Sequence, residues 1–157
     1  MVLSLGGAAG AEEPDFISLG AGVFDFNRQK DEGGEFRLEY RSRVRLGPFK
    51  PFAAASGSTT GHFLISGGVL MDLFFGRRVV ITPSFAPGYY TGGNSELDLG
   101  HELEFRSQIE FAYRFDDRSR LGLAVSHTSN ASIADTNPGS ESAILYYSLP
   151  IESLFGD

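Results

Sequence analysis

Two segments of the chain alternate between apolar and polar residues over their whole length. In residues 35–46 every odd position carries a charge, and every even position except Ser42 is apolar. In residues 101–115 the odd positions are mainly apolar and the even positions mainly polar. Successive side chains of a β-strand point to opposite faces, so this alternation predicts two long strands. No segment of useful length has the period of an amphipathic helix.

Weaker alternation predicts six more strands, at residues 16–26, 51–57, 61–74, 77–89, 119–130 and 141–155. The connections after the second, fourth and sixth predicted strands are short. Those after the first, fifth and seventh are longer, and only the short one after the third breaks the trend. Short turns at one end and long loops at the other are typical of outer-membrane barrels. We therefore expect an all-β fold, an eight-stranded antiparallel up-and-down transmembrane β-barrel over residues 12–157.

The alternation alone fits two kinds of barrel. A soluble lipocalin-like carrier places its apolar face inside, whereas a membrane barrel places it outside. The charged faces of the two long strands hold nearly equal numbers of glutamate and arginine, and almost no lysine. Because the arginine fork pairs well with carboxylates, these charges can neutralise one another in a narrow lumen. The pattern favours the membrane barrel, with the soluble carrier as the alternative.

Composition narrows the classes of function. The chain has 157 residues, which fits one domain, and 41% of them are hydrophobic. No apolar run approaches the roughly 20 residues of a membrane-spanning helix. The absence of cysteine excludes disulfides, thiol nucleophiles and cysteine metal sites. With a net charge of −7 and no basic cluster, a nucleic-acid partner is not expected.

The first residues are read separately from the barrel. Residues 1–11 are small and apolar and end in Ala9-Gly10-Ala11, a pattern that signal peptidases cut. We expect residues 1–11 to be the remnant of a signal peptide, which points to an exported protein.

Three polar residues share the apolar face of the last two predicted strands. His127 and Ser129 lie at i and i+2, which places them on one side of a strand about 6.5–7 Å apart. Glu141 has the same parity on the next strand and lies at the same end of the hairpin. Facing lipid costs a charged group about 2–4 kcal/mol at the bilayer midplane and almost nothing at the interface.

Nucleophilic catalysis would explain why these three polar residues lie together on an apolar face. Ser129 would attack an ester carbonyl, His127 would take its proton, and Glu141 would orient the imidazole. The position implies an ester lipid of the outer leaflet as substrate. A His-x-Ser pattern followed by a glutamate also arises by chance, so a non-catalytic structural or adhesive barrel is the alternative. Asp135 is a second candidate for the acid, but Glu141 fits the strand parity better.

A longer motif surrounds these residues. Residues 127–130 read His-Thr-Ser-Asn and residues 137–141 read Asn-Pro-Gly-Ser-Glu. They resemble the motif of the lipid A 3-O-deacylase family, PagL, whose pattern is His-x-Ser-Asn and then Asn-Pro-Gly-x-Glu. The resemblance implies Ser129 as nucleophile, His127 as general base and Glu141 as orienting acid.

The resemblance also implies the surroundings and the substrate. Asn130 would support the site, and the Asn137 side chain and the Ser132 backbone N–H would form the oxyanion hole. No metal or cofactor is implied. The substrate would be lipid A of lipopolysaccharide, among the outer-membrane lipids of a Gram-negative bacterium, with the site facing the outer leaflet. The products would be a 3-hydroxy fatty acid and 3-O-deacylated lipid A.

The remaining polar and aromatic candidates have simpler interpretations. His62 and His101 stand at strand ends, where we expect them at the membrane interface. Tyr89 and Tyr90 suit an aromatic girdle.

Overall fold

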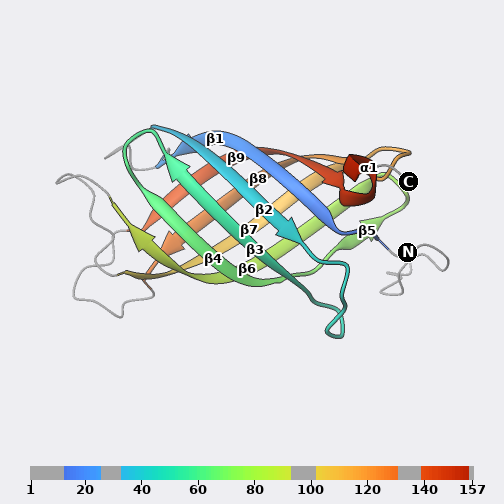
Figure 1. The fold of residues 1–157 in the computed structure, drawn as a ribbon, viewed down its shortest axis with the longest axis horizontal. Coiled ribbons are helices and arrows are strands. Elements are labelled where there is room, and N and C mark those ends of the chain that lie inside the picture. Colours follow the sequence, from blue (N-terminus) through green and yellow to red (C-terminus); the bar gives the residue numbers. More distant parts are fainter. Residues whose placement is uncertain (1–12, 26–32, 93–101, 131–138, 156–157) are drawn as a thin grey trace.

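The protein is described by a computed structural model over residues 13–25, 33–92, 102–130 and 139–155. Its elements form one sheet (Figure 1). The strands are β1 (Phe16–Phe24), β2 (Gly33–Arg41), β3 (Lys50–Ser58), β4 (Phe63–Leu70), β5 (Leu73–Phe75), β6 (Val79–Thr91), β7 (Leu103–Arg114), β8 (Arg120–Ser129) and β9 (Ser140–Pro150), and a short helix α1 (Ile151–Phe155) follows.

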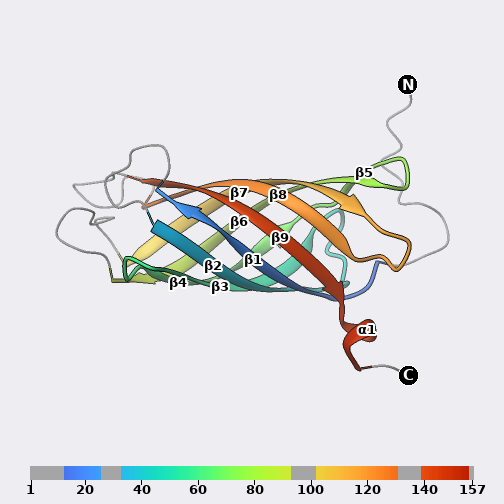
Figure 2. The ribbon, with the colours of Figure 1, turned by 90° about the horizontal axis from the view of Figure 1, so that it is seen from above.

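The sheet closes into an eight-stranded barrel, in which β4 and β5 together occupy the position of one strand. Neighbouring strands pair antiparallel in the order β4-β3-β2-β1-β9-β8-β7-β6, and β4 pairs back onto β6. The short β5 also pairs with β6, so β4 and β5 are two parts of one interrupted strand of the barrel. Figures 1 and 2 show the strands running obliquely around a common axis. The predicted eight-stranded antiparallel barrel is confirmed.

An inward-pointing carboxylate accompanies the break between β4 and β5. Asp72, which follows β4, binds Lys50 and accepts hydrogen bonds from Thr82 at 2.7 Å and Arg120 at 3.0 Å. The predicted single strand over residues 61–74 is interrupted at residues 71 and 72, between β4 and β5.

The outer surface is apolar and the lumen is charged. In β2 the side chains of Phe36 and Leu38 are 63% and 50% exposed, whereas Arg37 and Glu39 between and beside them are buried. β7 also alternates between exposed and buried positions, and its Glu104, Arg106, Gln108 and Glu110 are all buried. A soluble carrier needs an apolar interior, so that alternative is wrong.

Ion pairs across the lumen brace opposite walls of the barrel. Arg41 of β2 lies 2.6 Å from Glu110 of β7, and Arg106 of β7 lies 2.9 Å from Glu39 of β2. The Tyr146 hydroxyl of β9 donates to Glu39 at 2.7 Å. As the sequence predicted, buried charges of opposite sign neutralise one another. The ion pairs tie β7 to β2 on the opposite wall, and the tyrosine ties β9 to β2.

Two predicted strands are shorter than expected, for one reason. β2 ends at Arg41 and β9 ends at Pro150, and both residues pair with Phe16, the first residue of β1. Past this level neither strand has β1 as a neighbour. The prediction that strands continue to residues 46 and 155 is therefore wrong. Arg43 and Arg45 are exposed in the turn after β2 instead of lining the lumen.

After β9 the chain forms the helix α1, which lies at the end of the barrel where β1 begins (Figure 2). The Ile151 backbone N–H donates to the Asp15 carbonyl at 2.9 Å. Within the described residues no helix is long and apolar enough to cross a membrane.

Candidate active site

An imidazole and a carboxylate face each other on the outer surface of the β8–β9 hairpin. His127 and Glu141 are directly paired in the register of these strands. Nδ1 of His127 lies 3.0 Å from Oε1 of Glu141, and their side chains are 47% and 20% exposed. This contact leaves Nε2 of His127 as the nitrogen that can exchange a proton with another group. The sequence placed both residues at the loop-bearing end of this hairpin, and the register of β8 and β9 agrees with that position.

Ser129 shares the outward face with His127. It is the last residue of β8, it is partly buried, and its parity matches that of the exposed Leu123 and Val125. Two residues of strand separate it from His127, a step of about 6.5–7 Å between Cα atoms. The hydroxyl, the imidazole and the carboxylate therefore gather at one end of one hairpin, as the parity predicted.

Gly139 packs against the free edge of the His127 ring. Its φ of 67° is a conformation that favours glycine. A Cβ atom at this position would lie 2.8 Å from Cε1 and 3.3 Å from Nε2 of His127. Gly139 thus lies at the Cε1–Nε2 edge of the imidazole, and Glu141 lies at Nδ1. This close approach gives the glycine of the Asn-Pro-Gly motif a physical reason.

The supporting residues are only partly visible. Asn130 follows Ser129 and is completely buried, so it lies on the inner side of the wall instead of the outer face. Asn137 and Ser132, the expected oxyanion-hole donors, lie outside the described residues, as does Asp135.

The candidate site has aromatic and aliphatic neighbours. Phe105 pairs with Ser129 across β7–β8, and its ring stacks on that of Phe85 with centroids 5.9 Å apart. Sequence reasoning gave no role to Ser107, which is exposed on the same face and pairs with His127. A single serine in the alternating segment 101–115 does not indicate a functional residue. Its position beside His127 becomes visible only from the register of β7 against β8.

Two expectations at the strand ends are corrected. His62 is buried inside the barrel mouth, where Nδ1 contacts the Tyr90 hydroxyl and the ring lies 4.4 Å from that of Phe24. Tyr90 is buried with it, so neither residue belongs to the membrane interface. Tyr89 has the opposite parity and is 53% exposed on the outer face, as expected for a girdle. His101 lies outside the described residues.

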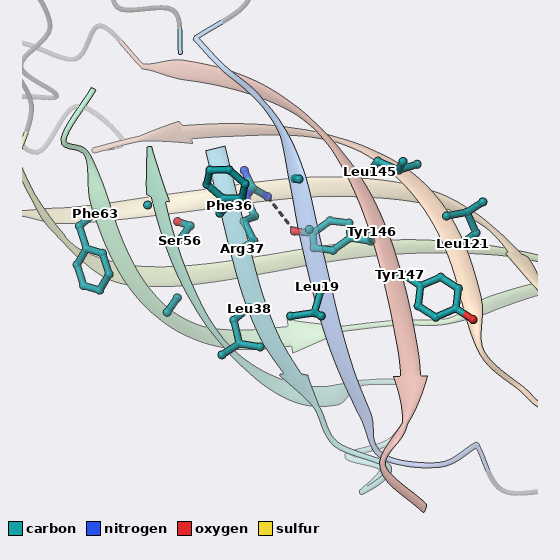
Figure 3. Close-up of a pocket in the computed structure, with 14 residues that line it drawn as sticks. Leu19, Phe36, Arg37, Leu38, Ser56, Phe63, Leu121, Leu145, Tyr146 and Tyr147 are labelled. Carbon is teal, nitrogen blue, oxygen red and sulfur yellow. Dashed lines mark hydrogen bonds between the residues drawn. The ribbon is translucent and has the colours of Figure 1, made fainter. Parts of the chain in front are cut away.

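A groove of about 560 Å³ on the outer face is lined by residues of β8, β9, β1, β2, β3 and β4 (Figure 3). Large side chains such as Leu145, Leu19 and Phe36 stand around a floor that includes Ala21 and Gly57. Because it opens on the apolar face, the groove suits hydrocarbon. His127, Ser129 and Glu141 do not line this groove, so the groove and the candidate reactive groups are separate features of the outer face.

The described residues contain no group of three or more metal-ligating side chains. The hydroxyl, imidazole and carboxylate of the hairpin are groups of the kinds that carry out nucleophilic attack and proton transfer.

Solved structures with the same fold are outer-membrane barrels. A crystal structure described as the outer membrane enzyme PagL matches with a TM-score of 0.68 and 20% identity, covering 86% of this chain and 99% of that chain. Neisserial surface protein A matches with a TM-score of 0.60 and 8% identity, covering 87% and 96%. The Yersinia pestis outer membrane protein Ail matches with a TM-score of 0.51 and 11% identity, covering 87% and 100%.

The family comparison goes beyond the fold. A comparison with curated protein sequences finds no match to this chain. The model of one family, lipid A 3-O-deacylase (PagL), matches residues 49–150, which is more than half of the 157 residues. The chain therefore belongs to the PagL family of lipid A 3-O-deacylases, which are ester hydrolases.

Proposed function

We propose that this protein removes the 3-O-linked acyl chain of lipid A with Ser129 as nucleophile, His127 as general base and Glu141 as orienting acid. The observation that carries the proposal is the contact of 3.0 Å between His127 and Glu141 on an otherwise apolar outer face. An imidazole and a carboxylate exposed on a hydrocarbon-facing surface need a reason, and acyl transfer on a lipid supplies one.

The reaction follows from the position of each atom. Oγ of Ser129 attacks the ester carbonyl carbon while Nε2 of His127 accepts the hydroxyl proton. Glu141, bound to Nδ1, stabilises the imidazolium that forms. The bond between the carbonyl carbon and the sugar oxygen then breaks, and the leaving sugar hydroxyl takes the proton from His127. Water hydrolyses the acyl-enzyme by the same steps in reverse order, which releases the fatty acid and restores Ser129.

The location of the hairpin supports a substrate in the outer leaflet. Ser129 ends β8 and Ser140 begins β9, so the candidate site lies at the end of the barrel opposite to α1 (Figure 1). The two longest connections, between β6 and β7 and between β8 and β9, are at this end. In outer-membrane barrels such loops face outward. The lipid A portion of lipopolysaccharide would then reach the site by lateral diffusion in the outer leaflet.

Mass spectrometry of lipid A incubated with the refolded protein in detergent tests the proposal. The wild-type protein is expected to remove one 3-hydroxyacyl group, and Ser129→Ala is expected to leave the spectrum unchanged. A matched control is Ser126→Ala, which removes a hydroxyl from the lumen side of the same strand, where it binds Arg37. If Ser129→Ala deacylates at the wild-type rate, the proposed nucleophile is wrong.

A further inference from the structure

A fourth polar side chain stands beside the proposed triad on the outer face. The outward positions of β7 are Leu103, Phe105, Ser107, Ile109, Phe111 and Tyr113, because the residues between them point into the lumen. Away from the tyrosine at the α1 end, Ser107 is the one polar side chain among these described positions. A hydroxyl on a hydrocarbon-facing surface is costly unless a polar group meets it.

The register places Ser107 in one row with the two ionisable residues. Ser107 pairs with His127, and His127 pairs with Glu141, so the row crosses β7, β8 and β9. Side chains of such direct pairs have Cβ atoms about 4.5–5.5 Å apart. Since Nδ1 of His127 already contacts Glu141, Ser107 lies on the other side of the imidazole, where a substrate would approach over β7.

The row lies deeper in the membrane than the proposed nucleophile. β8 runs toward its loop end at Ser129, so the level of His127 and Ser107 is one step nearer to the middle of the barrel. A lipid whose ester carbonyl is at Ser129 has its sugar above this level and its acyl chain below. Ser107 therefore faces the first carbons of the chain rather than the head group.

The spacing suits a substituent close to the carbonyl. Ser107 and Ser129 are diagonal neighbours, about 7–8 Å apart at the Cα atoms. An attack distance of about 3–3.5 Å at Ser129 and a hydrogen bond of about 2.8 Å at Ser107 can be joined by two carbon–carbon bonds along a bent path. The stacked rings of Phe85 and Phe105 border this path, since Phe85 pairs with Ser107 and Phe105 pairs with Ser129.

We propose that Ser107 is a specificity residue whose hydroxyl hydrogen-bonds an oxygen on the third carbon of the scissile acyl chain. The enzyme then prefers 3-hydroxyacyl esters to unsubstituted acyl esters of the same length. This inference rests on the proposed function, because it places the ester carbonyl at Ser129. Ser107 takes no part in bond making, so its loss changes substrate choice and leaves the reaction itself intact.

Two synthetic glycolipid esters that differ only in the 3-hydroxyl of the acyl chain test the inference. Values of kcat/KM are measured for both with the refolded wild-type protein, Ser107→Ala and Ser107→Thr. The wild type is expected to prefer the hydroxylated ester about three- to tenfold, the effect of one hydrogen bond. Ser107→Ala is expected to abolish that preference by losing activity on the hydroxylated ester alone, and Ser107→Thr is expected to retain it.

An equal loss on both esters with Ser107→Ala would overturn the inference, because a role in folding or in positioning His127 affects both substrates. An unchanged preference would overturn it as well. Ser129→Ala, measured in parallel, separates this failure from that of the proposed function. If it is inactive while Ser107→Ala keeps the wild-type preference, the proposed triad stands and only the role of Ser107 fails.

Discussion

Nδ1 of His127 lies 3.0 Å from Oε1 of Glu141 across one residue pair of an antiparallel hairpin. The pair lies on the outer wall, while the ion pairs of the lumen lie behind it. An imidazole held by a carboxylate on one edge is oriented to exchange protons on the other. This relationship depends on strand register alone, so a shift of β9 against β8 by one residue would turn Glu141 into the lumen.

Replacing Glu141 by Gln should lower kcat by about 10³–10⁴-fold, the effect of neutralising the acid of a Ser-His-Asp triad. The amide keeps the size of the side chain but no longer stabilises the imidazolium. Steady-state kinetics on lipid A in micelles measure the loss. Ser142→Ala, on the lumen side of the same strand, is the control and should keep its activity. Activity of Glu141→Gln near that of the wild type would exclude Glu141 as the orienting acid.

Gly139→Ala should lower kcat by about 10–100-fold, because the added Cβ would displace the ring of His127. The matched control is Gly76→Ala at the other end of the barrel. Gly76 has a φ of 71°, close to the 67° of Gly139, but no atom lies within 4 Å of the position of its Cβ. Both variants should lose about 1–2 kcal/mol of stability from the left-handed conformation. Equal activity of the two variants would mean that the contact with His127 is unimportant.

Arg41→Met should destabilise the barrel by about 3–5 kcal/mol, since it leaves the buried Glu110 and Glu39 without this partner. Urea unfolding in phospholipid vesicles measures the free energy of unfolding. Arg78→Met serves as the control, because its pair with Asp116 is exposed, and it should change stability by less than about 1 kcal/mol. Similar small effects of both substitutions would argue against a lumen held together by its buried ion pairs.

Leu123→Arg tests which surface faces lipid. Leu123 is 57% exposed on β8, and a cation there should cost about 2–4 kcal/mol in vesicles if the residue lies near the bilayer midplane. The control is Leu46→Arg in the turn beyond β2, where Leu46 is 58% exposed and the cost should be near zero. A Leu123→Arg variant as stable as the control would place this wall in water.

The sequence predicted the features that depend on parity. Strict alternation in residues 35–46 and 101–115 divided the side chains between two faces, and the structure has the same two faces in β2 and β7. The common face of His127, Ser129 and Glu141 follows from the same rule and is confirmed. Their catalytic roles stay predictions, as do the donors Asn137 and Ser132.

Features that depend on pairing between neighbouring strands could not be predicted from the sequence. The ends of β2 and β9 are set by Phe16 of β1, which alternation within a single strand does not reveal. The inward position of His62 was missed because residues 63–65 are all apolar, so the alternation there does not show which face is the inner one. The structure is needed to see that Ser107 pairs with His127 and that Gly139 lies against the ring of His127.

Covalent trapping tests the proposed nucleophile most directly. The refolded wild-type protein is treated in micelles with a long-chain alkylsulfonyl fluoride, a reagent for activated serines, and the modified peptide is located by mass spectrometry. We predict one adduct, on Ser129, with loss of deacylase activity in proportion to labelling, and no adduct in His127→Ala. Inactivation with the label on a different serine, or an active protein in which Ser129 is labelled without loss of activity, would contradict the proposed triad.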